Sequence, residues 1–220
     1  MDILVPEVLR TEMQIDKGFD TDTFFIINSS GTPYDTLLDR YDGVPTVNGK
    51  IRVVHRDNVG ISFGGYLDTF NKYSSEYDYW FFVEDDVIVY REGYVKAFID
   101  ELEKTDATFI ALSPISTYIK PHCGGGCGLT STNYMREIYS KDKVDSLLTQ
   151  WAGYSGYDVA ANSLRESNAE IEFTSRFNLR NHHKYSPICE NFSKGHSTQR
   201  RFATHYNLNE LEFIYKVGIR

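Results

Sequence analysis

The most constraining feature of this 220-residue sequence is an apolar run that leads directly into three acids. Residues 80–83 read Trp-Phe-Phe-Val, and Glu84, Asp85 and Asp86 follow at once. Such a run predicts a buried strand, and adjacent carboxylates at its exit are costly unless a partner neutralises their charge. In an open α/β sheet, ligands bind at the carboxyl ends of the strands. The triplet therefore predicts a ligand site, with an exposed acidic turn as the alternative.

Apolar and polar residues alternate along the chain in a way that predicts strands and helices in turn. Strands are expected at residues 2–6, 23–28, 51–55, 79–83 and 108–113, and helices at residues 7–17, 62–73 and 94–104. This alternation predicts the α/β class, with a central, mostly parallel mixed sheet between helices. Because no linker or internal repeat interrupts it, we expect a single domain over residues 1–220.

The acidic balance of the chain argues against a protein that coats nucleic acid. The formal net charge is −8, whereas phosphate binding needs a basic surface. No apolar run approaches the length of a membrane span, and the first residues lack the basic start and apolar stretch of a signal peptide. Three cysteines cannot all pair within one chain, which favours a reducing compartment. We therefore expect a cytoplasmic protein without a membrane span or a nucleic-acid partner.

Basic residues gather in one later segment. Between Arg176 and Arg201 there are six Lys or Arg residues and one acid, Glu190. This local excess of positive charge predicts an anion site, and a solvated basic loop is the alternative.

The acidic triplet and five further segments resemble the motifs of GT-A fold, family-2-like glycosyltransferases. Glu84, Asp85 and Asp86 resemble the acidic DxD motif, with Glu84 in its first acidic position. The other matching segments are residues 3–6 (ILVP), 26–30 (IINSS), 56–60 (RDNVG) with Gly64 and Gly65, 123–130 (CGGGCGLT) and 156–165 (GYDVAANSLR). They are similar, in order, to the opening strand, a base-contacting loop, a segment beside the nucleotide, an acceptor-side loop and a second acidic motif. The chain is more distantly similar to small sugar-transferase domains of large algal viruses.

This resemblance implies a GT-A type α/β/α sandwich in which residues 1–115 bind the nucleotide and residues 116–220 form the acceptor side. It implies a glycosyltransferase of glycan biosynthesis that moves a sugar from a UDP-sugar to a glycan or another hydroxyl acceptor. The departing diphosphate is an anion, so the resemblance also implies a Mn²⁺ or Mg²⁺ ion that neutralises it.

The resemblance assigns roles to individual residues. The nucleotide-binding set is Pro6, Asn28, Ser29, Arg56, Asn58, Glu84 and Asp85. Asp86 and His183 are the expected metal ligands, and His182 and His196 are alternatives to His183. A packed or surface imidazole is the alternative role for each histidine.

Asp158 is the expected catalytic base, because a carboxylate can take the proton of the attacking acceptor hydroxyl. A base in this role implies direct displacement with inversion, and a helix cap is its alternative role. The chain departs from the family pattern at Tyr157, where the motif usually has an acid, and at Glu84, which replaces the usual first Asp.

Two other functions stay open. A metal-dependent nucleotidyltransferase also uses carboxylates at strand ends, but it normally has a glycine-rich basic loop near the N-terminus, which residues 5–8 do not offer. A non-catalytic sugar- or calcium-binding module would use the same carboxylates without turnover.

Overall fold

The computed structural model describes residues 4–29, 33–84, 87–89, 91–112, 115–117, 119–150, 168–182, 203–205 and 218–219. The helices are α1 (Leu4–Gln14), α2 (Ile61–Tyr73), α3 (Tyr94–Lys104), α4 (Thr132–Ile138) and α5 (Lys141–Gln150), with 3₁₀ turns η1 (Pro33–Thr36), η2 (Asp39–Tyr41) and η3 (Gly124–Gly126). Residues 168–174 are also helical. The strands are β1 (Thr23–Ser29), β2 (Ile51–Asp57), β3 (Tyr79–Phe82), β4 (Val87–Val89), β5 (Phe109–Ala111), β6 (Ile115–Ser116), β7 (His122–Cys123), β8 (Gly128–Ser131), β9 (Leu179–Asn181), β10 (Ala203–His205) and β11 (Gly218–Ile219).

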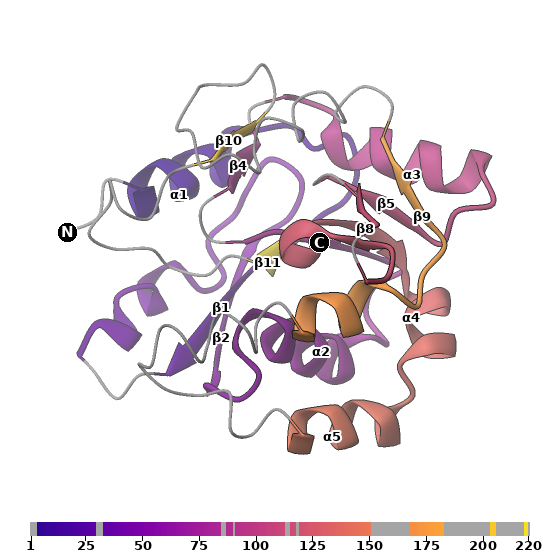
Figure 1. Ribbon diagram of the computed structural model, residues 1–220. Coiled ribbons are helices and arrows are strands. Elements are labelled where there is room, and N and C mark those ends of the chain that lie inside the picture. The colour runs from indigo at the N-terminus through magenta and orange to yellow at the C-terminus, as the bar shows by residue number, and fades with distance from the viewer. Residues whose placement is uncertain are drawn as a thin grey trace.

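A seven-stranded mixed sheet forms the centre of the fold, in the order β2-β1-β11-β3-β8-β5-β9 (Figure 1). Strand β1 pairs in parallel with β2, and β5 pairs in parallel with β9. Strands β11 and β8 run antiparallel to both of their neighbours. It follows that β2, β1, β3, β5 and β9 run in one direction and end at one edge of the sheet. The α/β class predicted from the sequence is confirmed. The expectation of a mostly parallel sheet is wrong, because four of the six pairings are antiparallel: β11 and β8 each run against both of their neighbours.

Side chains on the two faces of the sheet belong to two separate hydrophobic cores. Phe25 and Phe81 pack with α1 and α3, whereas Phe24, Trp80 and Phe82 pack with α2, α4 and α5. Helices therefore cover both faces, as Figure 1 shows. A strand that is buried on both faces reads as a continuous apolar run. This explains why the run that ends in the acidic triplet is apolar at every position.

The strand predicted at residues 2–6 is wrong, because α1 begins at Leu4. Pro6 lies in the first turn of this helix, where its missing N–H has no partner to lose. Further along α1, Val8, Leu9 and Glu12 are buried, at a spacing that fits one helix face. A short apolar run has no period that separates a strand from a helix, which is why the sequence predicts a strand where the helix begins.

The other predicted elements are confirmed with small shifts at their ends. Strands β1, β2, β3 and β5 lie within or over the predicted strands, and α2 and α3 match the predicted helices. Helix α1 ends at Gln14, before the predicted end at residue 17. Among the described helices, none is both long enough and apolar enough to cross a membrane.

A buried ion pair holds the segment between α1 and β1. Lys17 Nζ lies 3.0 Å from Glu12 Oε2, and the two side chains are 0% and 3% exposed. Lys17 Nζ also donates to Thr23 Oγ1 at 3.1 Å, and the Thr23 hydroxyl donates to Glu12 Oε2 at 2.9 Å. Because the three groups satisfy one another, much of the penalty for removing two charges from water is offset. The start of β1 is thereby fixed.

Replacing Lys17 with methionine should lower the free energy of unfolding by about 3–5 kcal/mol, because Glu12 would then be a buried charge without a cation. Urea denaturation measures the change. Lys96→Met is the matched control: it removes an exposed pair with Asp100 at 2.7 Å, and such pairs contribute less than about 0.5 kcal/mol. Equal small losses in both variants would contradict the role given to the Lys17 pair.

Candidate functional site

The carboxyl ends of β1 and β2 bring the first two predicted site residues together. Asn28 of β1 lies in register with Arg56 of β2, and Ser29 lies in register with Asp57. Arg56 Nη1 donates to Asn28 Oδ1 at 2.5 Å. Parallel strands end at the same edge, so residues that directly follow the apolar part of each strand meet there. Asn28, Ser29 and Arg56 are therefore placed together as the sequence predicts.

Arg56 fixes the loop after β2. Its Nε lies 3.3 Å from Asp68 Oδ2, its Nη2 donates to the Val59 carbonyl oxygen at 2.8 Å, and its side chain is only 7% exposed. Burial lowers the pKa of Arg56, and the charge of Asp68 opposes this shift. Because each of its three nitrogens donates within the chain, the guanidinium holds the loop after β2 in place.

Asn58 supplies an unsatisfied acceptor in this loop. Its Oδ1 is buried and has no hydrogen-bond donor among the described residues. A buried acceptor without a donor is unfavourable by roughly 1–3 kcal/mol. An N–H or O–H group of a ligand would remove that penalty, so Asn58 is a position where binding gains free energy.

Glycines let helix α2 approach the ends of β1 and β2 closely. A Cβ atom on Gly64 would overlap the Val59 carbonyl oxygen and lie 3.3 Å from Arg56 Nη2. A Cβ atom on Gly65 would lie 3.3 Å from Ile26 Cγ2 and 3.7 Å from Asn28 Oδ1. The start of α2 therefore packs directly on the loop that carries Asn58.

Glu84, which follows β3, lies against a glycine-rich loop at this same edge. The loop contains η3, and Gly125 within it has a left-handed φ of 63°. A Cβ atom on Gly125 would lie 2.5 Å from Glu84 Oε2. The neighbouring Gly126 packs on Phe63, in the first turn of α2, where a Cβ atom would lie 2.8 Å from the ring. Helix α2 thus packs on the loop that carries Asn58, through Gly64, and on the glycine-rich loop beside Glu84, through Phe63. Asn58 and Glu84 therefore belong to one region.

Glu170 and His122 also belong to this region, and neither is predicted from the sequence. Gly125 N–H donates to Glu170 Oε2 at 3.0 Å, and Glu170 Oε1 lies 3.4 Å from His122 Nε2. His122 Nδ1 lies 2.7 Å from the Lys120 carbonyl oxygen, so this ring nitrogen carries a proton. Glu170 is 45 residues from Gly125 in sequence. No motif or spacing marks such a contact, although the acid at 170 lies in the acceptor-side half that the resemblance implies.

The sequence predicts Pro6 at the end of a strand, and this prediction is wrong, because Pro6 is part of α1. Asp85, Asp86, Asp158 and His183 lie outside the described residues. Their predicted roles therefore stay predictions.

His182 has its alternative role as a packed imidazole. It is 2% exposed, its Nε2 lies 3.1 Å from the Ala97 carbonyl oxygen, and its ring stacks on Phe98 at 4.8 Å between centroids. This side chain joins the end of β9 to α3.

Two residues of the basic segment form ion pairs away from this edge. Arg176 pairs with Glu172 one helical turn earlier, and Arg180 Nε lies 3.0 Å from Glu101 Oε1 on α3. Arg180 is 51% exposed, so its pair lies at the surface. These two arginines do not supply the anion site predicted from the local charge, whereas the other four basic residues of the segment lie outside the described part of the chain.

The described residues offer one carboxylate of the predicted metal site, that of Glu84. Its oxygens are hard ligands of the kind that Mg²⁺ and Mn²⁺ prefer, and it is half-buried at the ligand-binding edge of the sheet. Within the described ranges, no group of three or more His, Cys, Asp or Glu residues is arranged to hold a metal ion. Glu84 fits a metal contact, and Asp86 and His183, the metal ligands predicted from the sequence, lie outside the described residues.

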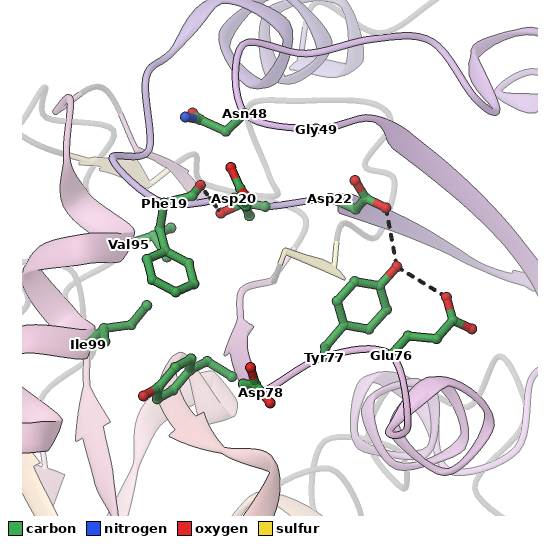
Figure 2. Close-up of a pocket in the computed structure, with 12 residues that line it drawn as sticks. Phe19, Asp20, Asp22, Asn48, Gly49, Glu76, Tyr77, Asp78, Val95 and Ile99 are labelled. Carbon is green, nitrogen blue, oxygen red and sulfur yellow. Dashed lines mark hydrogen bonds between the residues drawn. The ribbon is translucent and has the colours of Figure 1, made fainter.

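A cavity of about 750 Å³ lies at the opposite edge, next to the starts of β1 and β3 (Figure 2). Its acidic lining residues are Asp20, Asp22, Glu76 and Asp78. Tyr77 donates to Asp22 Oδ2 at 3.2 Å, and none of the described lining residues is basic. Negative charge of this density repels a diphosphate. Arg52 Nη1 lies 4.0 Å from Asp22 Oδ2 and 3.6 Å from Glu76 Oε2 and offsets part of this charge, but the lining carries four carboxylates. The cavity is therefore a poor site for a diphosphate.

No protein-family model, curated protein or solved structure matches the chain.

Gly64→Ala should lower the free energy of unfolding by about 1–3 kcal/mol, because the new methyl group overlaps the Val59 carbonyl oxygen. In an ordinary helix position the same change raises the free energy of unfolding by about 1 kcal/mol. The sign of the change therefore tells whether α2 packs closely on the loop. Urea denaturation measures it. Gly65→Ala is the matched control, with a smaller expected loss because its nearest contact, Ile26 Cγ2, is at 3.3 Å. A stabilised Gly64→Ala protein would rule out the close approach of α2.

Proposed function

We propose that the chain is a GT-A type glycosyltransferase that moves a sugar from a UDP-sugar to a glycan or another hydroxyl acceptor. The observation that carries this proposal is that Asn28, Asn58 and Glu84 lie at or just after the carboxyl ends of β1, β2 and β3, which share one edge of the sheet. Ligands of α/β sheets bind at this edge. The edge combines neutral amide groups, which suit a base, with a carboxylate, which suits a metal ion or a ribose.

The nucleotide would bind over the ends of β1 and β2. Uracil carries an N–H between two carbonyl groups, and an Asn side chain has one acceptor and two donors. The unsatisfied Oδ1 of Asn58 would accept the base N–H, which would remove its desolvation penalty. Asn28 and Ser29 would line the same pocket, and Arg56 would hold the loop in place. Pro6 has no part in this proposal, because it lies in α1.

The diphosphate would lie toward the acidic triplet. A Mn²⁺ or Mg²⁺ ion would supply positive charge to the departing phosphate oxygen. Asp86 and His183 are the proposed ligands of this ion, and Glu84 and Asp85 are proposed contacts to the ion or the ribose. Among these four, the described residues include Glu84, whose position against Gly125 supports the assignment.

Asp158 is the proposed base for the transfer step. It would take the proton of the acceptor hydroxyl while that oxygen attacks the anomeric carbon and the bond from this carbon to the diphosphate oxygen breaks. Attack from the side opposite the leaving group inverts the anomeric configuration, as in single-step glycoside hydrolysis. The acceptor would approach from the side of the glycine-rich loop.

Asn58→Ala should weaken the binding of UDP in the presence of Mn²⁺ about tenfold, which corresponds to one lost hydrogen bond. The free energy of unfolding should not fall, because Oδ1 has no partner to lose among the described residues. Titration calorimetry measures the first quantity and urea denaturation the second. A purely structural Asn58 would give the opposite pattern, with lower stability and unchanged affinity.

Thr46→Val is the matched control, since Thr46 Oγ1 is also buried without a partner in the described part of the chain. It should leave UDP affinity unchanged. Failure of the wild-type protein to bind UDP with Mn²⁺ would overturn the proposal. Release of UDP from a panel of UDP-sugars separates a transferase from a binding module, and release of pyrophosphate from UTP with a sugar phosphate would identify a nucleotidyltransferase instead.

A further inference from the structure

We propose that Glu170 positions the carboxylate of Glu84, acting through the backbone of Gly125. This inference rests on the proposed function, in which Glu84 contacts the metal ion or the ribose. Two carboxylates from distant segments meet at this one glycine, Glu84 after β3 and Glu170 in the helical residues 168–174. Glu170 is therefore a positioning residue: it contacts the loop, and the loop contacts Glu84.

The first observation is that the Glu84 carboxylate lies where a side chain on residue 125 would be. A Cβ atom there would lie 2.5 Å from Glu84 Oε2 and 2.7 Å from Glu84 Cδ, so the carboxylate occupies the space that a side chain would fill. Gly125 also has a φ of 63°, which other residues rarely adopt. The position of the Glu84 carboxylate consequently depends on where the loop places Gly125.

The second observation is a contact that holds the loop from the helical residues 168–174. Glu170 Oε2 accepts the Gly125 N–H at 3.0 Å, and Thr174 Oγ1 accepts the Cys123 N–H at 3.1 Å. Residues four apart lie on one helix face, so this face supplies two acceptors to the backbone of the loop. His122 Nε2 lies 3.4 Å from the other oxygen of Glu170.

The arrangement orders Glu84 before a ligand arrives. A side chain that must be ordered during binding reduces affinity, and a side chain that is already held does not. Without the Glu170 contact, the loop would hold Gly125 less firmly and the Glu84 carboxylate would sample other positions. Loss of the contact should therefore weaken binding about three- to tenfold without removing any group that touches the ligand.

Two variants of Glu170 test the proposal. Glu170→Gln keeps an oxygen acceptor for the Gly125 N–H, whereas Glu170→Ala removes it. In protein labelled with ¹³C-glutamate, the carboxyl resonance of Glu84, assigned with Glu84→Gln, should move by more than its linewidth in Glu170→Ala and stay in place in Glu170→Gln. The dissociation constant of UDP with Mn²⁺ should rise about three- to tenfold in the first variant and stay within about twofold of wild type in the second.

Glu172→Ala is the matched control, because Glu172 lies on the same helical segment and pairs with Arg176 away from the loop. It should change neither readout. An unmoved Glu84 resonance in Glu170→Ala would overturn the proposal, and so would a moved resonance with unchanged UDP affinity. If the wild-type protein binds no UDP, the proposed function fails, and the Glu84 resonance still decides whether Glu170 positions this carboxylate.

Discussion

The parallel pairing of β1 with β2 is the constraint on which the candidate site depends. Its register places Asn28 beside Arg56, and the guanidinium then holds the loop that carries Asn58. A slip of one residue would turn Asn28 to the other face of the sheet and break this contact. The register is stable because helices bury both faces of the sheet. A slip of one residue would move the side chains of each hydrophobic core to the opposite face.

Glycine backbones complete the region that the strands begin. Gly64 lets α2 lie directly on the loop after β2, and Gly125 leaves room for the carboxylate of Glu84. Both positions depend on the missing side chain, so the chemistry of the edge is set as much by close packing as by charged groups. The acidic cavity at the other edge shows the contrast, since its lining includes four carboxylates, and Arg52 lies beside two of them, Asp22 and Glu76.

The sequence predicts β1, β2, β3 and β5, whose apolar runs are buried, but it does not predict β8 or β11, which lie inside the sheet. Asn28, Arg56 and Glu84 lie at or just after the ends of predicted strands, so their shared edge could be predicted, whereas their roles stay predictions. The sequence misplaces residues 2–6, since so short an apolar run has no period. Glu170 could not be predicted, because its contact with Gly125 spans 45 residues and depends on tertiary packing.

The most direct test of the central claim, that a nucleotide binds at the carboxyl edge, is a hydrogen-exchange footprint of UDP with Mn²⁺ on the wild-type protein. The account predicts slower amide exchange in residues 56–65 and 123–127, which form the loop after β2, the start of α2 and the glycine-rich loop. Protection confined to residues 19–22 and 76–79, which line the acidic cavity, would contradict it.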